Sequence, residues 1–106
     1  MNASERQQIE HRLIGVLKTI FDPEIPVNIY DLGLIYKLEV DDDHTVYITM
    51  TLTAPNCPIA GQLIEEVKQK AGGTLGIKNV DLSLTFDPPW DKSMLSDEAK
   101  LELGLL

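Results

Sequence analysis

Apolar residues in the first part of the chain recur at the spacing of a helix. Between residues 4 and 21 they define one face, which predicts an amphipathic helix. The residues of this face are Ile9, Leu13, Val16, Leu17 and Ile20. Ser4, with Gln7 three positions later, has the spacing of a capping box and is the expected N-cap. We expect the helix to end before Pro23, because proline cannot extend it.

Strict alternation replaces the helical spacing in the middle of the chain. Residues 32–40 are rich in branched and aromatic side chains and predict a strand. A polar turn at residues 41–44 separates it from a second predicted strand at residues 45–53, so the two should form a β-hairpin. One face of the second strand should carry Val46, Ile48, Met50 and Leu52. The opposite face should carry Tyr47, Thr49, Thr51 and Thr53.

The rest of the chain predicts another helix, a third strand and a short final helix. Pro58 suits the first turn of a helix, which should end at Gly72. Residues 80–86 alternate again and predict the third strand. Trp90 follows and is expected to anchor the C-terminal segment by packing, although an exposed aromatic contact for a partner is the alternative. Ser96 should cap the final helix, whose first turn carries two acidic residues.

This order of elements predicts an α+β fold. We expect a two-layer α-β-β-α-β domain with the helices on one face of a small mixed sheet, followed by a short C-terminal helix. The length of 106 residues suits a single domain over residues 1–106 and leaves no room for two conventional cores.

Charge and cysteine content narrow the classes of function. The net charge is −8, from 17 acidic and nine basic residues, and so acidic a surface repels nucleic-acid backbones. The glycines of GTLG at residues 73–76 match a KH loop, but this stretch carries no basic residue. We expect no nucleic-acid partner. No apolar run approaches the roughly 20 residues that span a membrane, and one cysteine suits a reducing compartment, so the cytoplasm is the expected location.

That cysteine, Cys57, lies just before Pro58, where the second strand gives way to the second helix. If Pro58 is the first helical residue, Cys57 is the N-cap. The backbone N–H groups and the helix dipole at that position lower the pKa of a thiol. Two roles stay open. Cys57 is either a thiolate ready for metal or client chemistry, or an inert buried thiol that packs as a small hydrophobe.

Other uses of a cysteine find little support in the sequence. His11 should lie on the polar side of the first helix and His44 in an acidic turn, so both are expected to be solvated. A thiol-dependent enzyme would need one of them as a base beside Cys57. A structural zinc site would need four ligands. Any iron or cluster held by Cys57 would therefore take further ligands from a second subunit or from outside the protein.

A second polar cluster, formed by three carboxylates, lies in the loop just before the predicted hairpin. The candidate pocket consists of Cys57, Asp22, Glu24, Asp31, Thr51 and Thr53. The three carboxylates either form a solvated loop or line one pocket with the cysteine, while the threonines add hydroxyls from the end of the second strand. A carboxylate near the sulfur would raise the pKa of the thiol and oppose the helix dipole.

Three separated stretches resemble a known family. They are DPEIPVNIYDLGLIY (22–36), MTLTAPNCP (50–58) and LTFDPPWDKSMLSDEAKLELG (84–104). In this order they resemble the small iron–sulfur assembly domain of SufT and PaaD, long catalogued as a domain of unknown function. The resemblance covers nearly the whole chain. It implies a two-layer α/β fold and a non-enzymatic role in the maturation of iron–sulfur proteins, as a carrier or targeting adaptor.

The resemblance also implies site residues and partners. The family's reactive cysteine matches Cys57, its acidic motif matches Asp22 and Glu24 with Asp31 and Gly33 following, and its strand-end threonine matches Thr53. It implies a transient iron or iron–sulfur cargo, with the assembly machinery and apo-protein clients as partners. A homodimer is compatible with this reading. Because the chain has no second cysteine, it resembles SufT more than PaaD, whose relatives assist a multicomponent oxygenase.

Overall fold

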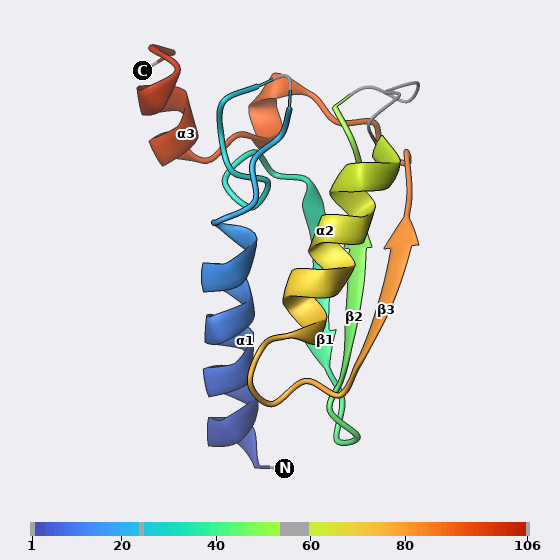
Figure 1. The fold of residues 1–106 in the computed structure, drawn as a ribbon. Helices are drawn as coiled ribbons and strands as arrows, with labels where there is room; N and C mark the ends of the chain where they lie inside the picture. Colours follow the sequence, from blue (N-terminus) through green and yellow to red (C-terminus); the bar gives the residue numbers. More distant parts are fainter. Residues whose placement is uncertain (1, 24, 54–59, 106) are drawn as a thin grey trace.

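The described residues form three α-helices and a three-stranded sheet in this computed structural model (Figure 1). These residues are 2–23, 25–53 and 60–105. In chain order the elements are α1 (Ala3–Leu17), β1 (Ile35–Val40), β2 (Thr45–Met50), α2 (Ala60–Gly72), β3 (Asn79–Leu84), the 3-10 turn η1 (Lys92–Met94) and α3 (Asp97–Glu102). The predicted α+β class and order of elements are confirmed. None of the described helices is long and apolar enough to cross a membrane.

The sheet has the order β1-β2-β3 and is mixed. β1 pairs antiparallel with β2, and β2 pairs parallel with β3. The helix α2 lies between β2 and β3 in the chain and makes the crossover that parallel strands need. The register shifts near the start of β1, where Ile35 faces Met50 and Lys37 faces Thr49. Tyr36 is the extra residue of this bulge, and bulges redirect side chains. Its hydroxyl donates to the Pro88 carbonyl (2.8 Å) and thereby ties β1 to the C-terminal segment.

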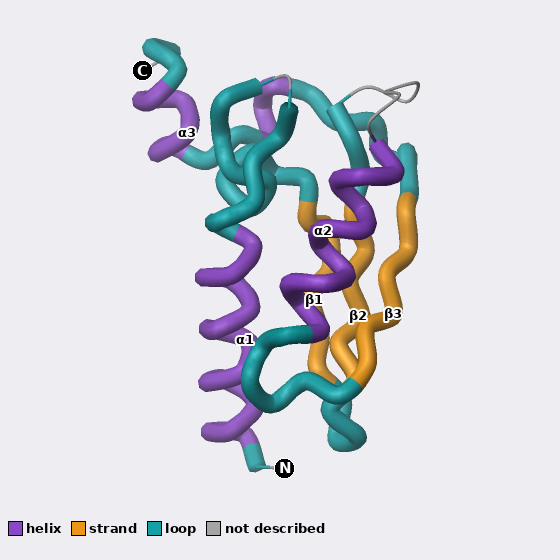
Figure 2. The backbone as a smooth tube through the Cα atoms, in the orientation of Figure 1, coloured by secondary structure: helices purple, strands orange, loops and turns teal. Residues whose placement is uncertain are grey.

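Both long helices lie on one face of the sheet, as predicted (Figures 1 and 2). α1 contacts α2 and β1, and α2 contacts β3. Between these layers the core buries residues such as Leu13, Leu17, Val46, Ile48 and Val67. The third strand adds Val80 and Leu82, which are partly buried against this core. The other face of the sheet is exposed and polar, with Lys37, Glu39, Tyr47, Asp81 and Ser83. This one-sided burial explains the alternation seen in the sequence.

The ends of the early elements differ from the prediction. Asn2, not Ser4, caps α1, because the Asn2 side chain accepts a hydrogen bond from the Glu5 N–H (2.8 Å). The helix ends at Leu17, so Ile20 is buried from the following turn and not from the helix. The strand predicted over 32–40 starts only at Ile35.

The second strand is shorter than predicted, and this changes the position of a candidate residue. β2 ends at Met50, after which the chain leaves the regular ladder. Thr51 follows the strand and is fully buried, whereas Tyr47 within the strand is exposed. Alternation assigns faces only while a strand continues, so the predicted faces apply to β2 itself.

The later elements agree well with their predictions. The expected helix start at Pro58 lies outside the described residues, but α2 ends at Gly72 as expected. Ser96 caps α3, accepting a hydrogen bond from the Ala99 N–H (3.1 Å). Trp90 packs against the core, and its indole N–H donates to the Leu32 carbonyl (2.7 Å). The predicted anchoring role of Trp90 is confirmed.

Candidate functional site

The described candidate residues gather at one end of the molecule, which we call the site end. It comprises the turn 18–34, residues 51–53 at the end of β2, and the first turn of α2 (Figure 1). Since β1 is antiparallel to β2, the beginning of one strand meets the end of the other there. Cys57 and Glu24 lie outside the described residues. The predicted N-cap position of Cys57 therefore stays a prediction.

Asp22 is buried although it carries a carboxylate. Only 7% of the residue is exposed. Its Oδ1 accepts a hydrogen bond from the Ile25 N–H (3.0 Å), and its own N–H donates to the Val27 carbonyl (3.2 Å). An Asp that bonds the backbone a few residues ahead stabilises a tight turn. Asp22 thus closes the loop that contains Pro23 and Pro26, neither of which can donate a backbone hydrogen bond.

A series of backbone hydrogen bonds links the Asp22 turn to the end of β2. The Ile29 N–H donates to Ile20 (2.9 Å), the Leu34 N–H to Ile29 (3.1 Å), and the Thr51 N–H to Leu34 (2.9 Å). Each step crosses from one segment to the next, and Ile20, Ile29 and Leu34 are fully buried. The residues after α1 and after β2 are therefore held at fixed positions relative to one another.

The Thr51 side chain buries its hydroxyl group. The residue is 0% exposed, and its Oγ1 has no hydrogen-bond partner among the described residues. An unmade hydrogen bond of this kind costs about 1–3 kcal/mol, so native proteins seldom keep one without a use for it. Thr53, two residues further along, is half-buried. These two threonines lead directly into the segment that contains Cys57.

The start of α2 lies against the Asp22 turn. A small cavity of about 110 Å³ is lined by Phe21 and Pro23 on one side and by Gln62, Leu63 and Glu66 of α2 on the other. Cys57 precedes Ala60, the first residue of α2, by three positions. The Asp22 turn and the first turn of α2 are thus neighbours, and a pocket shared with Cys57 stays a prediction.

Asp31 makes contacts of a different kind. Its Oδ2 accepts a hydrogen bond from the Asn28 side chain (2.8 Å), while Asn28 Oδ1 accepts one from the Asp31 N–H (2.9 Å). The Asp31 carbonyl accepts a hydrogen bond from the Ser96 N–H at the start of α3 (2.8 Å). Asp31 therefore fixes the shape of its turn and anchors the C-terminal segment to it.

Gly33 explains why this turn and the C-terminal segment fit closely. Its φ is +85°, and a Cβ atom at this position would overlap the Met94 carbonyl oxygen. Only glycine allows both the conformation and the approach. Trp90 and Tyr36 bind the same region. Sequence reasoning treated the motifs around Asp31 and Trp90 separately, because no local pattern shows that these two segments meet.

The histidines lie far from this end or in structural contacts. His11 is exposed on α1, as predicted. His44 was expected to be solvated, but it is half-buried, and its Nδ1 lies 2.7 Å from the Gly76 carbonyl. That bond links the β1–β2 turn to the loop before β3. Within the described residues, no group of three or more His, Cys, Asp or Glu side chains could hold a metal ion.

Comparisons with known proteins fit this arrangement. Residues 10–84 match the family model described as iron–sulfur cluster assembly protein. An Fe-S protein maturation auxiliary factor of Porphyromonas gingivalis is 53% identical over 103 residues, covering 97% of this chain and 98% of that protein. The auxiliary factor SufT of Staphylococcus aureus is 38% identical, covering 81% and 98%.

A solved structure shows the same fold over the full length. A Bacillus anthracis protein, described as a domain of unknown function, superposes with a TM-score of 0.88 and 34% identity, covering 99% of this chain and 100% of that one. The family match spans well over half of the 106 residues. The resemblance in the three sequence motifs and the fold thus lead to one conclusion: this chain belongs to the iron–sulfur cluster assembly protein family.

Proposed function

We propose that this chain is a maturation factor for iron–sulfur proteins that carries or targets iron or a cluster through Cys57. Close relatives are named as maturation auxiliary factors, and names of this kind describe assistance to other proteins, not turnover of a metabolite. The expected partners are the assembly machinery and apo-protein clients. We place this activity in the cytoplasm, where a lone thiol stays reduced.

The observation that carries the proposal is the buried hydroxyl of Thr51, which has no hydrogen-bond partner within the part of the chain that the structure describes. It leads into the Cys57 segment and is linked by backbone hydrogen bonds to the buried Asp22 turn. A buried polar group kept at a cost to stability is typical of a functional site, and Thr51 precedes Cys57 by only six positions in the sequence. We assign Cys57, Asp22, Glu24, Thr51 and Thr53 to the pocket.

Asp31, the sixth candidate, acts in this proposal by positioning. Its side chain is engaged with Asn28 and its carbonyl with Ser96, so its effect on the pocket passes through the turn. The cargo itself is bound as a substrate. Cys57 loses its proton to become the thiolate that binds iron, and because clusters need several ligands, the remaining ligands come from a partner.

Two substitutions test this assignment in cells that depend on the protein. Cys57→Ser should leave the fold intact and abolish maturation of a [4Fe–4S] client, measured as client activity at equal protein level. Thr51→Val keeps the shape but removes the buried hydroxyl, so it should raise the free energy of unfolding by about 1 kcal/mol while maturation falls.

Thr49→Val is the matched control, because Thr49 lies within β2 and outside the pocket. It should leave maturation unchanged. Full maturation by Cys57→Ser would show the thiol to be inert and would favour a purely structural adaptor. Normal maturation by a stabilised Thr51→Val would remove Thr51 from the site.

A further inference from the structure

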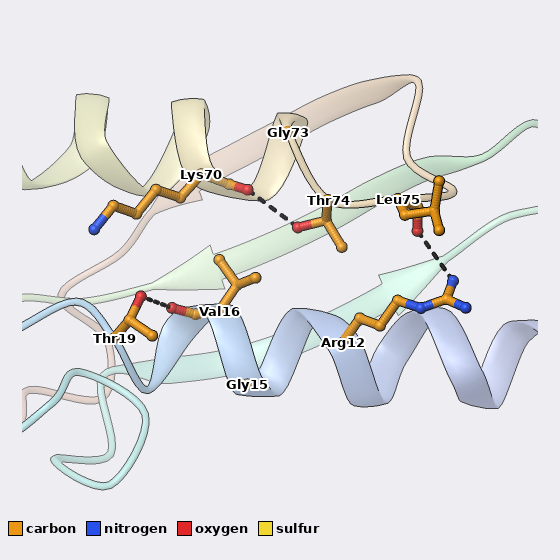
Figure 3. Close-up of a pocket in the computed structure, with 8 residues that line it drawn as sticks. All are labelled: Arg12, Gly15, Val16, Thr19, Lys70, Gly73, Thr74 and Leu75. Atoms are coloured by element: carbon orange, nitrogen blue, oxygen red, sulfur yellow. Dashed lines mark hydrogen bonds between the residues drawn. The ribbon is translucent and has the colours of Figure 1, made fainter.

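A groove separates the two long helices away from the site end (Figure 3). It has a volume of about 670 Å³ and lies between α1 and the end of α2 with its following loop. Its lining residues are Arg12, Gly15, Val16, Thr19, Lys70, Gly73, Thr74 and Leu75. Leu75 is 74% exposed at the rim and offers an apolar surface there.

Gly15 leaves space in this groove, although no contact within the described part of the chain requires a glycine there. It lies inside α1, where glycine is a poor helix former. A Cβ atom at Gly15 would meet nothing within 4 Å, whereas one at Gly76 would collide with the Ile9 side chain. Packing within the chain therefore requires Gly76 but not Gly15. A glycine without an internal reason fits the close approach of something from outside.

The charges of the groove are opposite to those of the whole protein. The chain carries a net charge of −8, yet the described lining contains Arg12 and Lys70 and no carboxylate. Lys70 pairs with Glu66 (2.7 Å). Arg12 donates to the Leu75 carbonyl (3.2 Å) and takes part in none of the ion pairs recorded for the described residues. The matching occupant carries an apolar side chain next to a carboxylate.

The chain itself carries such a segment in α3 and the residues that follow. Leu101 is 68% exposed and Leu105 is 53% exposed. Around them lie three carboxylates and one lysine, which gives a local net charge of −2: Asp97, Glu98 and Glu102 against Lys100. A Schellman motif fixes the end of the helix, with Gly104 at φ +75° and the Leu105 N–H bonded to the Lys100 carbonyl (2.7 Å).

We propose that α3 of one copy of this chain docks in the groove between α1 and α2 of a second copy. Leu101 enters beside Val16 and Leu75, above Gly15, and a carboxylate of α3 meets Arg12. The contact joins two different surfaces, α3 and the groove. If each of two copies places its α3 in the groove of the other, a closed dimer forms, whereas a head-to-tail arrangement adds further copies. This proposal does not depend on the function of Cys57.

A complementation experiment tests both surfaces together. Gly15→Leu fills the groove with a better helix former, and the double variant Leu101→Ser, Leu105→Ser removes the docking residues. Analytical ultracentrifugation over a range of concentrations gives the mass of each protein and of their mixture. Circular dichroism checks that both variants stay folded.

The wild-type protein should show a mass that rises with concentration above the 11.8 kDa of one copy. Each variant alone should stay at one copy, since each lacks one of the two surfaces. Their mixture should form a one-to-one complex, because the intact groove of one accepts the intact α3 of the other. Gln69→Leu adds an exposed leucine on α2 outside the groove and should associate like the wild type.

Three results would overturn the proposal. The first is a wild-type protein that stays at one copy at every concentration. The second is association that is lost with Gly15→Leu but kept without Leu101 and Leu105, which would assign the groove to another occupant. The third is a mixture that fails to associate although both variants are folded.

Discussion

Two acidic turns lie at opposite ends of the sheet (Figure 1). One of them buries its aspartate, and the other is largely exposed to solvent. The Asp22 turn belongs to the site end and is buried. The turn at residues 41–44 joins β1 to β2 and faces solvent at the other end, which we call the hairpin end. Both use an aspartate to bond the backbone of its own turn. They differ in how completely polar groups are buried.

At the hairpin end, Asp41 accepts several hydrogen bonds. They come from the Thr45 N–H (3.0 Å), the Asp43 N–H (2.9 Å) and the Tyr47 hydroxyl (3.0 Å). The bond from the Thr45 backbone, assisted by those from Tyr47 and Asp43, lowers the pKa of the Asp41 carboxyl. The same contact with Asp41 raises the pKa of the Tyr47 hydroxyl. These interactions stabilise the turn.

At the site end, burial of polar groups is more complete than at the hairpin end. Asp22 is removed from solvent, and the nearby Thr51 hydroxyl has no partner among the described residues. Burying polar groups costs free energy unless hydrogen bonds compensate. The hairpin end is therefore stabilised by hydrogen bonds near its surface, whereas the site end buries polar groups, among which Thr51 Oγ1 has no partner within the described residues.

The largest predicted effect comes from Gly33→Ala, which attacks the structural part of the site end. The new Cβ would overlap the Met94 carbonyl, and the positive φ adds strain. We expect the free energy of unfolding to fall by about 3 kcal/mol, with early release of the C-terminal segment. Urea denaturation followed by Trp90 fluorescence measures both, because Trp90 is the single tryptophan and docks on Leu32.

Gly15→Ala is the control for this substitution. Gly15 lies in α1 with open space around it, so alanine should stabilise the protein by about 1 kcal/mol. If both alanines had the same effect on stability, the close approach at Gly33 would not be important for holding the C-terminal segment.

The two ends also differ in how far the sequence alone predicts them. The hairpin was predicted with its turn at the correct residues, because alternation and a polar turn are local signals. His44 was still misjudged as solvated, since its bond to Gly76 joins residues 32 positions apart. Local patterns identify elements, but they do not show which elements meet.

The site end shows the same limit more strongly. Its candidate residues were identified by motif, yet Thr51 was placed within the second strand because the pattern does not show that β2 ends at Met50. The contact of Gly33 with Met94 depends on how a distant segment packs, and no spacing rule predicts it. Motifs therefore supplied the candidate residues, and tertiary packing was needed to show that Asp31 holds the C-terminal segment.

Asp22 stabilises its turn and is also proposed as a pocket residue, and a smaller effect on stability distinguishes these two roles. Asp22→Ala removes the acceptor for the Ile25 N–H and should cost about 1 kcal/mol. Asp22→Asn keeps an acceptor oxygen and should cost less than half of that in urea denaturation. If the negative charge serves the pocket, maturation of a [4Fe–4S] client should fall equally in both variants. Maturation that instead followed stability would make Asp22 a turn residue only.

The smallest effect, at the hairpin end, depends on pH. Because the pKa of Asp41 is lower in the folded protein than in the unfolded chain, its ionised form favours folding. This contribution is fully present above the unfolded pKa of about 3.9 and is lost as the pH falls through the lower folded value. Asp41→Asn should therefore shift the urea midpoint downward at pH 7, and the difference from the wild type should shrink in acid.

Asp43→Asn, an exposed position in the same turn, distinguishes this bond from the general charge of the turn. Removing any one negative charge from so acidic a protein relieves repulsion, so Asp43→Asn should leave the midpoint unchanged or raise it at pH 7. A downward shift of equal size in both variants would mean that the turn depends on its total charge. The hydrogen bonds to Asp41 would then not be what stabilises the hairpin end.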